Sequence, residues 1–243
     1  MRLLFVADLH YSLPQFDWLL ANADRYDLTV IGGDLLNIAS PLDPDVQIAI
    51  VEKYFGLLRQ KTPLLVSSGN HDGDDRNAAD ESIAAWLRAA RAERLYVDTD
   101  SVELGDTRIT LCPWWDGDHS RAELDTLLER EASRVRGRWI WIYHAPPEGA
   151  RTSWSGRKFI GDPFLRAWID RYQPDMVFSG HIHNSPFYAE GSWIDRLGRT
   201  WVFNPGKQIG PQPTTIALDL EAMTAEWNSH EGRSIRDLGI TDA

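Results

Sequence analysis

Five short apolar runs recur along the chain, and each ends at or just before a polar residue. They span residues 3–7, 28–31, 64–67, 139–143 and 176–178. Each run is nearly continuous and most are β-branched or aromatic, which is typical of strands buried on both faces. Segments with helical spacing separate or follow them, at 15–23, 45–59, 78–91, 121–134 and 162–172. Alternating strands and helices predict an α/β layered fold.

The C-terminal third has a different pattern, with short strand-like runs separated by turns. These runs span 187–189, 192–195, 200–203, 215–220 and 224–227, and a hairpin is expected at 102–104 and 108–111. We expect them to form antiparallel strands of a second sheet. The predicted architecture is a four-layer αββα sandwich of two mixed sheets flanked by helices. No long linker divides the chain, so we predict one domain over 1–228 and a loosely held polar tail over 229–243.

Composition narrows the classes of partner. The chain has 243 residues, with 25 Lys and Arg against 36 Asp and Glu, a formal charge of −11. This acidic balance disfavours a broad surface that tracks nucleic-acid phosphates, although it permits a local positive site. Cys112 is the only cysteine, so no internal disulfide can form. Asp8 interrupts the first apolar run after five residues, too few for a secretory signal or a membrane span. We expect a cytoplasmic protein without a membrane partner.

The polar residues at the run ends have the chemistry of metal ligands. In α/β sheets, ligands bind beyond the carboxyl ends of the strands. Oxygen and imidazole donors without thiolate suit Mn, Fe or Zn, and seven donors are too many for one tetrahedral ion. They fit two divalent ions that share one carboxylate, the arrangement used for in-line attack at phosphorus. The candidate ligands are Asp8, His10, Asp34, Asn70, His144, His181 and His183.

The spacing within two of these motifs supports a common site. Asp8 and His10, like His181 and His183, are two residues apart, so in an extended segment both side chains point the same way. The glycines just before Asp34, Asn70 and His181 allow close approach of the backbone.

The ordered motifs DLH (8–10), GD (33–34), GNHD (69–72), His144 and GHIH (180–183) resemble the calcineurin-like metallophosphoesterase superfamily. The HAPP segment at 144–147 and the NPG at 204–206 look most like its Icc-related bacterial and archaeal phosphoesterases. The resemblance implies an αββα fold, with one metal ion held by Asp8, His10 and His183. It implies a second ion held by Asn70, His144 and His181, with Asp34 bridging the two.

The same resemblance implies how the reaction proceeds. A hydroxide shared by the two ions would attack phosphorus. His71 would lie near the leaving-group oxygen as a general acid or charge stabiliser, and Asp72 would orient that loop. Ser/Thr protein phosphatases have arginines soon after the bridging aspartate, whereas Asp34 is followed by Leu-Leu-Asn37. This departure points away from protein phosphatases.

Five residues are candidates for substrate contact. Trp114 is either a base-stacking or lid residue or an ordinary packing residue. The basic residues after the HAPP segment either supply positive charge to an anionic substrate or are solvated loop charges. The five candidates are Asn37, Trp114, Arg151, Arg157 and Lys158.

The sequence thus favours a metal-dependent phosphodiesterase acting on a nucleotide-like or other small organic phosphate. A DNA or RNA nuclease and a phosphomonoesterase or nucleotidase are the alternatives on the same site. A non-catalytic binding module would require degraded ligands, and all seven are present. The sequence leaves the physiological substrate, the native metal pair and the oligomeric state open.

Overall fold

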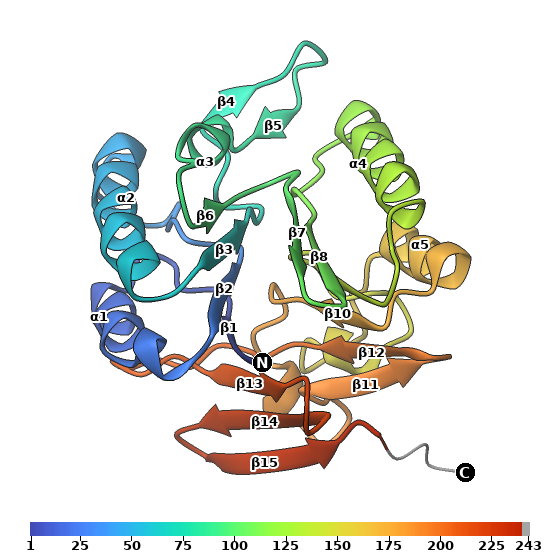
Figure 1. Ribbon diagram of the computed structural model, residues 1–243. Helices are drawn as coiled ribbons and strands as arrows, with labels where there is room; N and C mark the ends of the chain where they lie inside the picture. Colours follow the sequence, from blue (N-terminus) through green and yellow to red (C-terminus); the bar gives the residue numbers. More distant parts are fainter. Residues whose placement is uncertain (240–243) are drawn as a thin grey trace.

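In the computed structural model, which describes residues 1–239, two large β-sheets lie face to face with helices on both outer sides (Figure 1). The seven-stranded sheet has the order β15-β14-β13-β1-β2-β3-β6. Strands β1, β2, β3 and β6 are parallel. On the other side of β1, strand β13 pairs antiparallel with β1, β14 with β13, and β15 with β14. Their bounds are β1 Arg2–Val6, β2 Leu28–Gly32, β3 Leu64–Ser67, β6 Leu95–Tyr96, β13 Thr215–Asp219, β14 Thr224–Ser229 and β15 Gly232–Asp237.

The six-stranded sheet is also mixed. Its order is β11-β12-β10-β9-β8-β7, with β8, β9, β10 and β12 parallel and an antiparallel strand at each edge. A separate two-stranded hairpin pairs β4 Asp75–Arg76 with β5 Ser82–Ile83. The bounds in the six-stranded sheet are β7 Ser101–Leu104, β8 Thr107–Leu111, β9 Arg138–Ile142, β10 Met176–Phe178, β11 Ile194–Leu197 and β12 Thr200–Phe203.

Alternation along the central strands divides the apolar side chains into three layers of core. On β1, Leu3 and Phe5 pack between the sheets, whereas Leu4 and Val6 pack under the helices. Helices on one outer side cover the seven-stranded sheet, and helices on the other cover the six-stranded sheet (Figure 1). The predicted αββα sandwich is therefore confirmed. The helices are α1 Leu13–Asn22, α2 Pro44–Lys61 and α3 Ala85–Ala89 on the first side, and α4 Asp118–Ala132 and α5 Pro163–Tyr172 on the second.

Helix starts follow capping chemistry. Asp43 and Asp162 accept hydrogen bonds from backbone N–H groups of the first turns of α2 and α5, and a proline follows each cap. Three short 3-10 segments complete the described elements: η1 Ala23–Arg25, η2 Arg151–Ser153 and η3 Ser185–Phe187.

Two sequence expectations about elements are wrong. The helix expected over 78–91 is helical only in α3, because the Asn77 side chain accepts hydrogen bonds from the backbone of Ala79 and Glu81 and closes a hairpin turn. The strand expected at 187–189 is replaced by the end of η3 and a turn.

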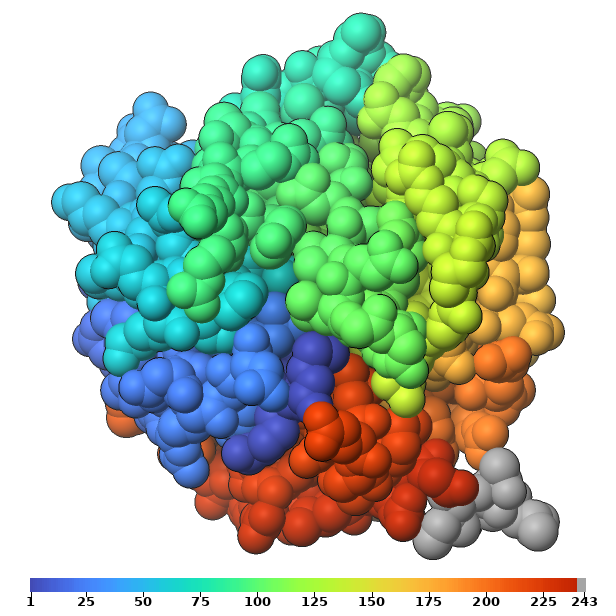
Figure 2. All heavy atoms as spheres, in the orientation of Figure 1, coloured from blue at the N-terminus to red at the C-terminus, as the bar shows by residue number. Residues whose placement is uncertain are grey.

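The polar segment expected as a loose tail from residue 229 instead contains β15, which pairs along its whole length with β14. Most of its side chains are exposed, because an edge strand needs no apolar face to form backbone hydrogen bonds. Residues 240–243 of that expected tail lie outside the described residues, and the single domain over 1–228 stays a prediction. Figure 2 shows the blue N-terminal segment lying against the red C-terminal segments, which agrees with the pairing of β1 and β13. Within residues 1–239, no helix has the length and apolar character needed to cross a lipid bilayer.

Candidate metal centre

The seven predicted ligands lie just beyond the carboxyl ends of five parallel strands. Asp8 and His10 follow β1, Asp34 follows β2 and Asn70 follows β3 in one sheet. In the other sheet His144 follows β9, and His181 and His183 follow β10. Backbone hydrogen bonds join neighbouring loops, for example from His10 N to Asp34 O at 2.8 Å and from Gly180 N to His144 O at 2.8 Å. The structure therefore brings all seven residues to one place between the two sheets.

Four of these side chains form the first group. One ligand atom from each of Asp8, His10, Asp34 and His183 lies within 4.8 Å of the others. His10 Nε2 is 3.1 Å from His183 Nε2 and 3.5 Å from Asp34 Oδ2, and His183 Nε2 is 3.3 Å from Asp8 Oδ1. Two imidazoles and two carboxylates converging at this spacing offer nitrogen and oxygen donors suited to a borderline divalent cation.

A second group adjoins the first and shares Asp34 with it. Ligand atoms of Asp34, His144 and His181 lie within 4.8 Å of one another. Asn70 Oδ1 lies 2.8 Å from His181 Nδ1, so the amide oxygen joins the same group. Asp34 is thus the carboxylate that belongs to both groups, as a bridging ligand must, while Asp8 Oδ1 also lies 3.8 Å from His144 Nε2.

The backbone is held in uncommon conformations at these residues. Asp8, His10, Asp34 and His181 all have positive φ angles, between 42° and 64°. Non-glycine residues rarely occupy this region, and such strain persists only where surrounding structure enforces it and commonly marks functional sites. Glycine is required beside them: a Cβ on Gly69 would lie 2.3 Å from Asp34 Oδ1.

His144 shows most directly that the residues fit a metal ion. Its side chain is fully buried, and its Nδ1 lies 2.8 Å from the carbonyl oxygen of Gly32, to which it can donate. Its Nε2 is buried without a hydrogen-bond partner and lies 3.2 Å from Asp34 Oδ2. A donated Nδ1–H leaves the Nε2 lone pair free, which is the arrangement of a metal-ligating histidine.

The electrostatics of the protein groups agree with this assignment. Burial opposes ionisation of Asp34, but His144 and His71 hold the pKa of this carboxyl well below its usual range. Burial also lowers the pKa of His144, yet the Asp34 and Asp8 carboxylates outweigh it and raise the pKa to about 10. A cation between His144 and Asp34 would take the place of this proton. Burial lowers the pKa of His10 and of His181 to about 4, so both are neutral and available as ligands near pH 7.

The two predicted catalytic residues lie differently. His71 borders the centre: its Nε2 is 3.9 Å from Asp34 Oδ2, and its ring meets that of His10 edge-on at 4.6 Å. Its backbone N–H donates to Asp34 Oδ1 at 2.9 Å. Asp72 is fully buried, and its carboxylate accepts hydrogen bonds from the backbone N–H groups of Leu35, Leu36 and Gly69 at 2.8–3.0 Å. Asp72 therefore joins the loops after β2 and β3.

The charge of Asp72 is costly where it lies. Burial and the nearby Asp34 raise the pKa of Asp72 to about 7, and the backbone donors act in the opposite direction. Three donors directed at one carboxylate explain why an acid is retained at a fully buried position.

Two of the five candidates for substrate contact lie beside the metal centre. Asn37 lines a cavity of about 370 Å³ together with His10 and His183. The Trp114 ring stacks on Tyr143 and lies against His181, with ring centroids 5.5 Å apart, so it forms a wall beside the second group.

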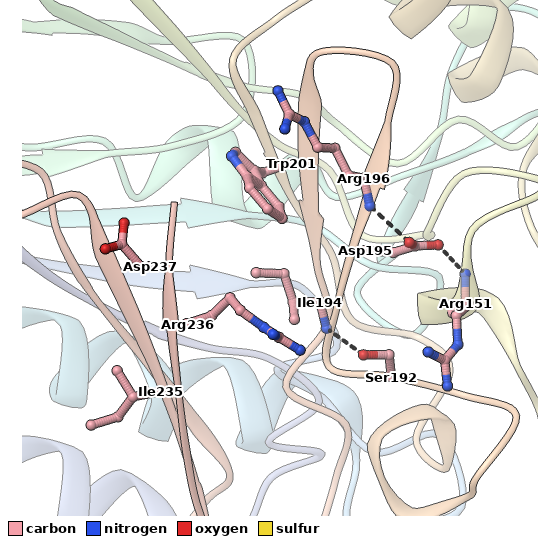
Figure 3. Close-up of a pocket in the computed structure, with 9 residues that line it drawn as sticks. All are labelled: Arg151, Ser192, Ile194, Asp195, Arg196, Trp201, Ile235, Arg236 and Asp237. Carbon is pink, nitrogen blue, oxygen red and sulfur yellow. Dashed lines mark hydrogen bonds between the residues drawn. The ribbon is translucent and has the colours of Figure 1, made fainter. Parts of the chain in front are cut away.

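The structure does not bring Arg151 to the centre. Arg151 lines a different cavity of about 460 Å³ with β11 and β15, where its N–H donates to Asp195 (Figure 3). Its guanidinium donates to backbone carbonyls of residues 189–191, so the charge is used to hold a loop. Arg157 and Lys158 are exposed in the loop before α5, and within residues 1–239 neither side chain forms an ion pair. For these two, substrate contact stays a prediction.

Two residues at the centre were missed from the sequence. Asn204 is fully buried, and its amide donates to the carbonyls of Thr152, Gly180 and Ile182, which fixes the loop that carries His181 and His183. Lys207 lines the same cavity as His10, and its backbone N–H donates to His183 O at 3.0 Å. The sequence signal that could have found them is the NPG motif just after β12, since Asn204 is its first residue and Lys207 directly follows it.

With this geometry in place, comparison with known proteins defines the class. The family model for calcineurin-like phosphoesterases matches residues 1–185, more than half of the chain. The chain therefore belongs to the calcineurin-like phosphoesterase family. No curated protein sequence matches it significantly.

Solved structures show the same fold in distant relatives. TT1561 of Thermus thermophilus is 13% identical with a TM-score of 0.60, and the match covers 98% of both chains. Purple acid phosphatase PPD1 from yellow lupin (Lupinus luteus) is 13% identical with a TM-score of 0.60, covering 98% of this chain and 52% of that one. GAP50, the anchor in the inner membrane complex of Plasmodium, is 10% identical with a TM-score of 0.57, covering 100% and 89%. At these identities the likeness extends to the fold alone.

Proposed function

We propose that this phosphoesterase hydrolyses phosphodiesters, of nucleotide-like or other small organic type, with two divalent cations of Mn, Fe or Zn. The observation that carries the proposal is the pair of ligand groups that share Asp34. Asp8, His10 and His183 would complete one position, and Asn70, His144 and His181 the other. Bound cations would supply Lewis acidity and lower the pKa of a water molecule at the phosphorus.

The protein groups around the centre have separate tasks. Asp34 is held by the backbone N–H of His71, so its position is set before any substrate binds. His71 is partly exposed beside Asp34, where its imidazole could donate a proton to the leaving-group oxygen. Asp72 acts at one remove, by holding the loops that carry Asp34 and His71. We therefore assign Asp72 a positioning role.

The net charge of −11 favours a small substrate over an extended polyanion. A cytoplasmic location is part of the same proposal. A nuclease predicts cleavage of single-stranded or nicked oligonucleotides at low salt. A monoesterase predicts faster turnover of p-nitrophenyl phosphate than of its diester. These two assays separate the alternatives from the proposed phosphodiesterase.

The direct test is hydrolysis of bis-p-nitrophenyl phosphate. We expect activity that disappears on chelation and returns with Mn²⁺. Absence of diester hydrolysis with Mn, Fe and Zn, in protein shown to bind two ions, would overturn the proposal.

The role of His71 is tested by His71→Ala, which we expect to lower kcat about 100-fold or more while the metal content is kept. His119→Ala, which removes an exposed histidine at the start of α4, is the matched control and should leave kcat unchanged. Equal kcat in the two variants would remove His71 from the reaction.

A further inference from the structure

The cavity beside the first ligand group has a distinctive set of polar groups. It measures about 370 Å³, within the range of small-molecule pockets, and the predicted ligands His10 and His183 are among its lining residues. A phosphoryl group bound at the metal ligands alone would leave much of this space free. The remaining lining residues are Leu9, Ser12, Gln15, Asn37, Lys207, Gln208, Ile209 and Gly210.

Most hydrogen-bonding groups of this lining serve the fold. The Gln15 amide donates to the carbonyls of Gln208 and Gly210, and the Gln208 amide donates to Gln212 O. Gln208 Oε1 accepts from the backbone N–H of His230. These bonds anchor the loop 207–210 to α1 and to the residue after β14.

The groups left over are donors. Within residues 1–239, the Lys207 ammonium, the Asn37 amide nitrogen and the Ser12 hydroxyl make no hydrogen bond, and Lys207 forms no ion pair. Among the residues that the structure describes, no carboxylate lines the cavity. A half-buried cation with two neutral donors, and no acceptor matched to them, is suited to the oxygens of an anionic group.

The backbone of Lys207 is hydrogen-bonded directly to that of the predicted ligand His183. The backbone N–H of Lys207 donates to the carbonyl of His183, and the preceding residue, Gly206, has a φ of +67°. A Cβ on Gly206 would lie 2.7 Å from His183 O, so only glycine permits this approach. The backbone of Lys207 is thereby fixed next to the predicted ligand His183, and its side chain lines the same cavity as His10 and His183.

Charge balance supports an extra anion. Two divalent cations against Asp8, Asp34 and a hydroxide leave a formal charge of about +1, and Lys207 adds one more positive charge. A simple phosphodiester brings a single negative charge, whereas a diphosphate brings at least one more.

We infer that Lys207, with Asn37 and Ser12, forms a subsite for a second phosphate, so that the preferred substrates are organic diphosphates such as nucleoside diphosphate derivatives. The inference rests on the proposed function for its reaction, but its binding component stands separately. Lys207 is a specificity-determining residue in this account.

The test is equilibrium binding of AMP and ADP to the Mn²⁺-loaded protein by isothermal titration calorimetry at fixed free Mn²⁺. A charge-assisted contact to the additional phosphate predicts ADP binding about tenfold tighter than AMP binding. Lys207→Met should reduce this preference to near unity, and Lys207→Arg should restore part of it. Lys53→Met, which removes an exposed lysine on α2, is the matched control and should keep the wild-type ratio.

Equal affinities of the wild-type protein for AMP and ADP, or a preference that persists in Lys207→Met, would overturn the inference. A protein that binds ADP selectively yet hydrolyses no ester would refute the proposed function and leave the subsite intact. Conversely, diester hydrolysis without selectivity for ADP would refute the subsite alone.

Discussion

Replacing Asp72 tests whether it acts by holding two loops together or by taking part in the reaction. In Asp72→Ala, the backbone N–H groups of Leu35, Leu36 and Gly69 lose their acceptor inside the protein. Each buried donor left unsatisfied costs about 1–3 kcal/mol, so the loss of unfolding free energy should be at least about 3 kcal/mol. That is a large part of the roughly 5–15 kcal/mol typical of a folded domain.

Asp72→Asn separates the contacts within this network. Leu35 and Leu36 share one carboxylate oxygen, and Gly69 uses the other. An asparagine can keep the first oxygen, but its amide nitrogen then faces the Gly69 N–H. We expect a loss of about 1–3 kcal/mol for Asp72→Asn, smaller than for Asp72→Ala.

Urea unfolding of the chelated protein measures both losses, provided the m-values stay equal. Activity is then measured with metal restored. The positioning role predicts that lost stability accompanies any fall in kcat. A kcat that falls about 100-fold in Asp72→Asn, with unfolding free energy within about 0.5 kcal/mol of wild type, would refute this reasoning.

Two further predictions concern buried polar groups behind the centre. Asp98 accepts hydrogen bonds from Ser68, and burial raises its pKa to about 6. Because the folded protein favours the protonated form of Asp98, this carboxyl contributes to the unfolding free energy below about pH 4. That contribution is lost as the pH rises through 6. Between about pH 4 and 7, the unfolding free energy of the wild-type protein should fall by roughly 3 kcal/mol relative to that of Asp98→Asn. Urea titrations at each pH measure this difference. Parallel pH profiles of unfolding free energy for the two proteins would contradict the prediction. Asn204→Ala removes one donor from each of three buried carbonyls, two of which, Gly180 O and Ile182 O, keep a backbone donor. We therefore expect a loss of about 1–3 kcal/mol in urea unfolding and weaker binding of Mn²⁺ by calorimetry, because the His181 loop loosens. Unchanged Mn²⁺ affinity in that variant would show that Asn204 does not position the ligands.

The fold could be predicted because its signals are local and repeated. Each buried parallel strand is a short apolar run, and the same runs end at Asp8, Asp34 and His144. Because parallel strands end at the same edge of a sheet, the polar residues at the strand ends are expected to lie together once the strands are predicted. The prediction of a helix over 78–91 was wrong because the side chain of Asn77 accepts backbone hydrogen bonds that close a hairpin. These local hydrogen bonds outweigh the helical spacing of the apolar residues.

The substrate end of the site could not be predicted in the same way. Arg151 follows a family motif closely in sequence, but its guanidinium is used by the carbonyls of a distant loop. Lys207 has no sequence motif of its own, and it reaches the cavity only because Gly206 and the anchoring Gln15 fix its loop. Such long-range contacts depend on the assembled sheets. The strained backbone at Asp34 and His181 is equally invisible in sequence.

The central claim is that Asp34 joins two metal positions, and counting bound metal tests it most directly. Protein loaded with Mn²⁺ and gel-filtered should contain two ions per chain by inductively coupled plasma mass spectrometry. Asp34→Ala should contain one ion or none, whereas Asp45→Asn, an exposed control on α2, should retain two. Fewer than two ions in the wild-type protein, or two ions in Asp34→Ala, would contradict the account.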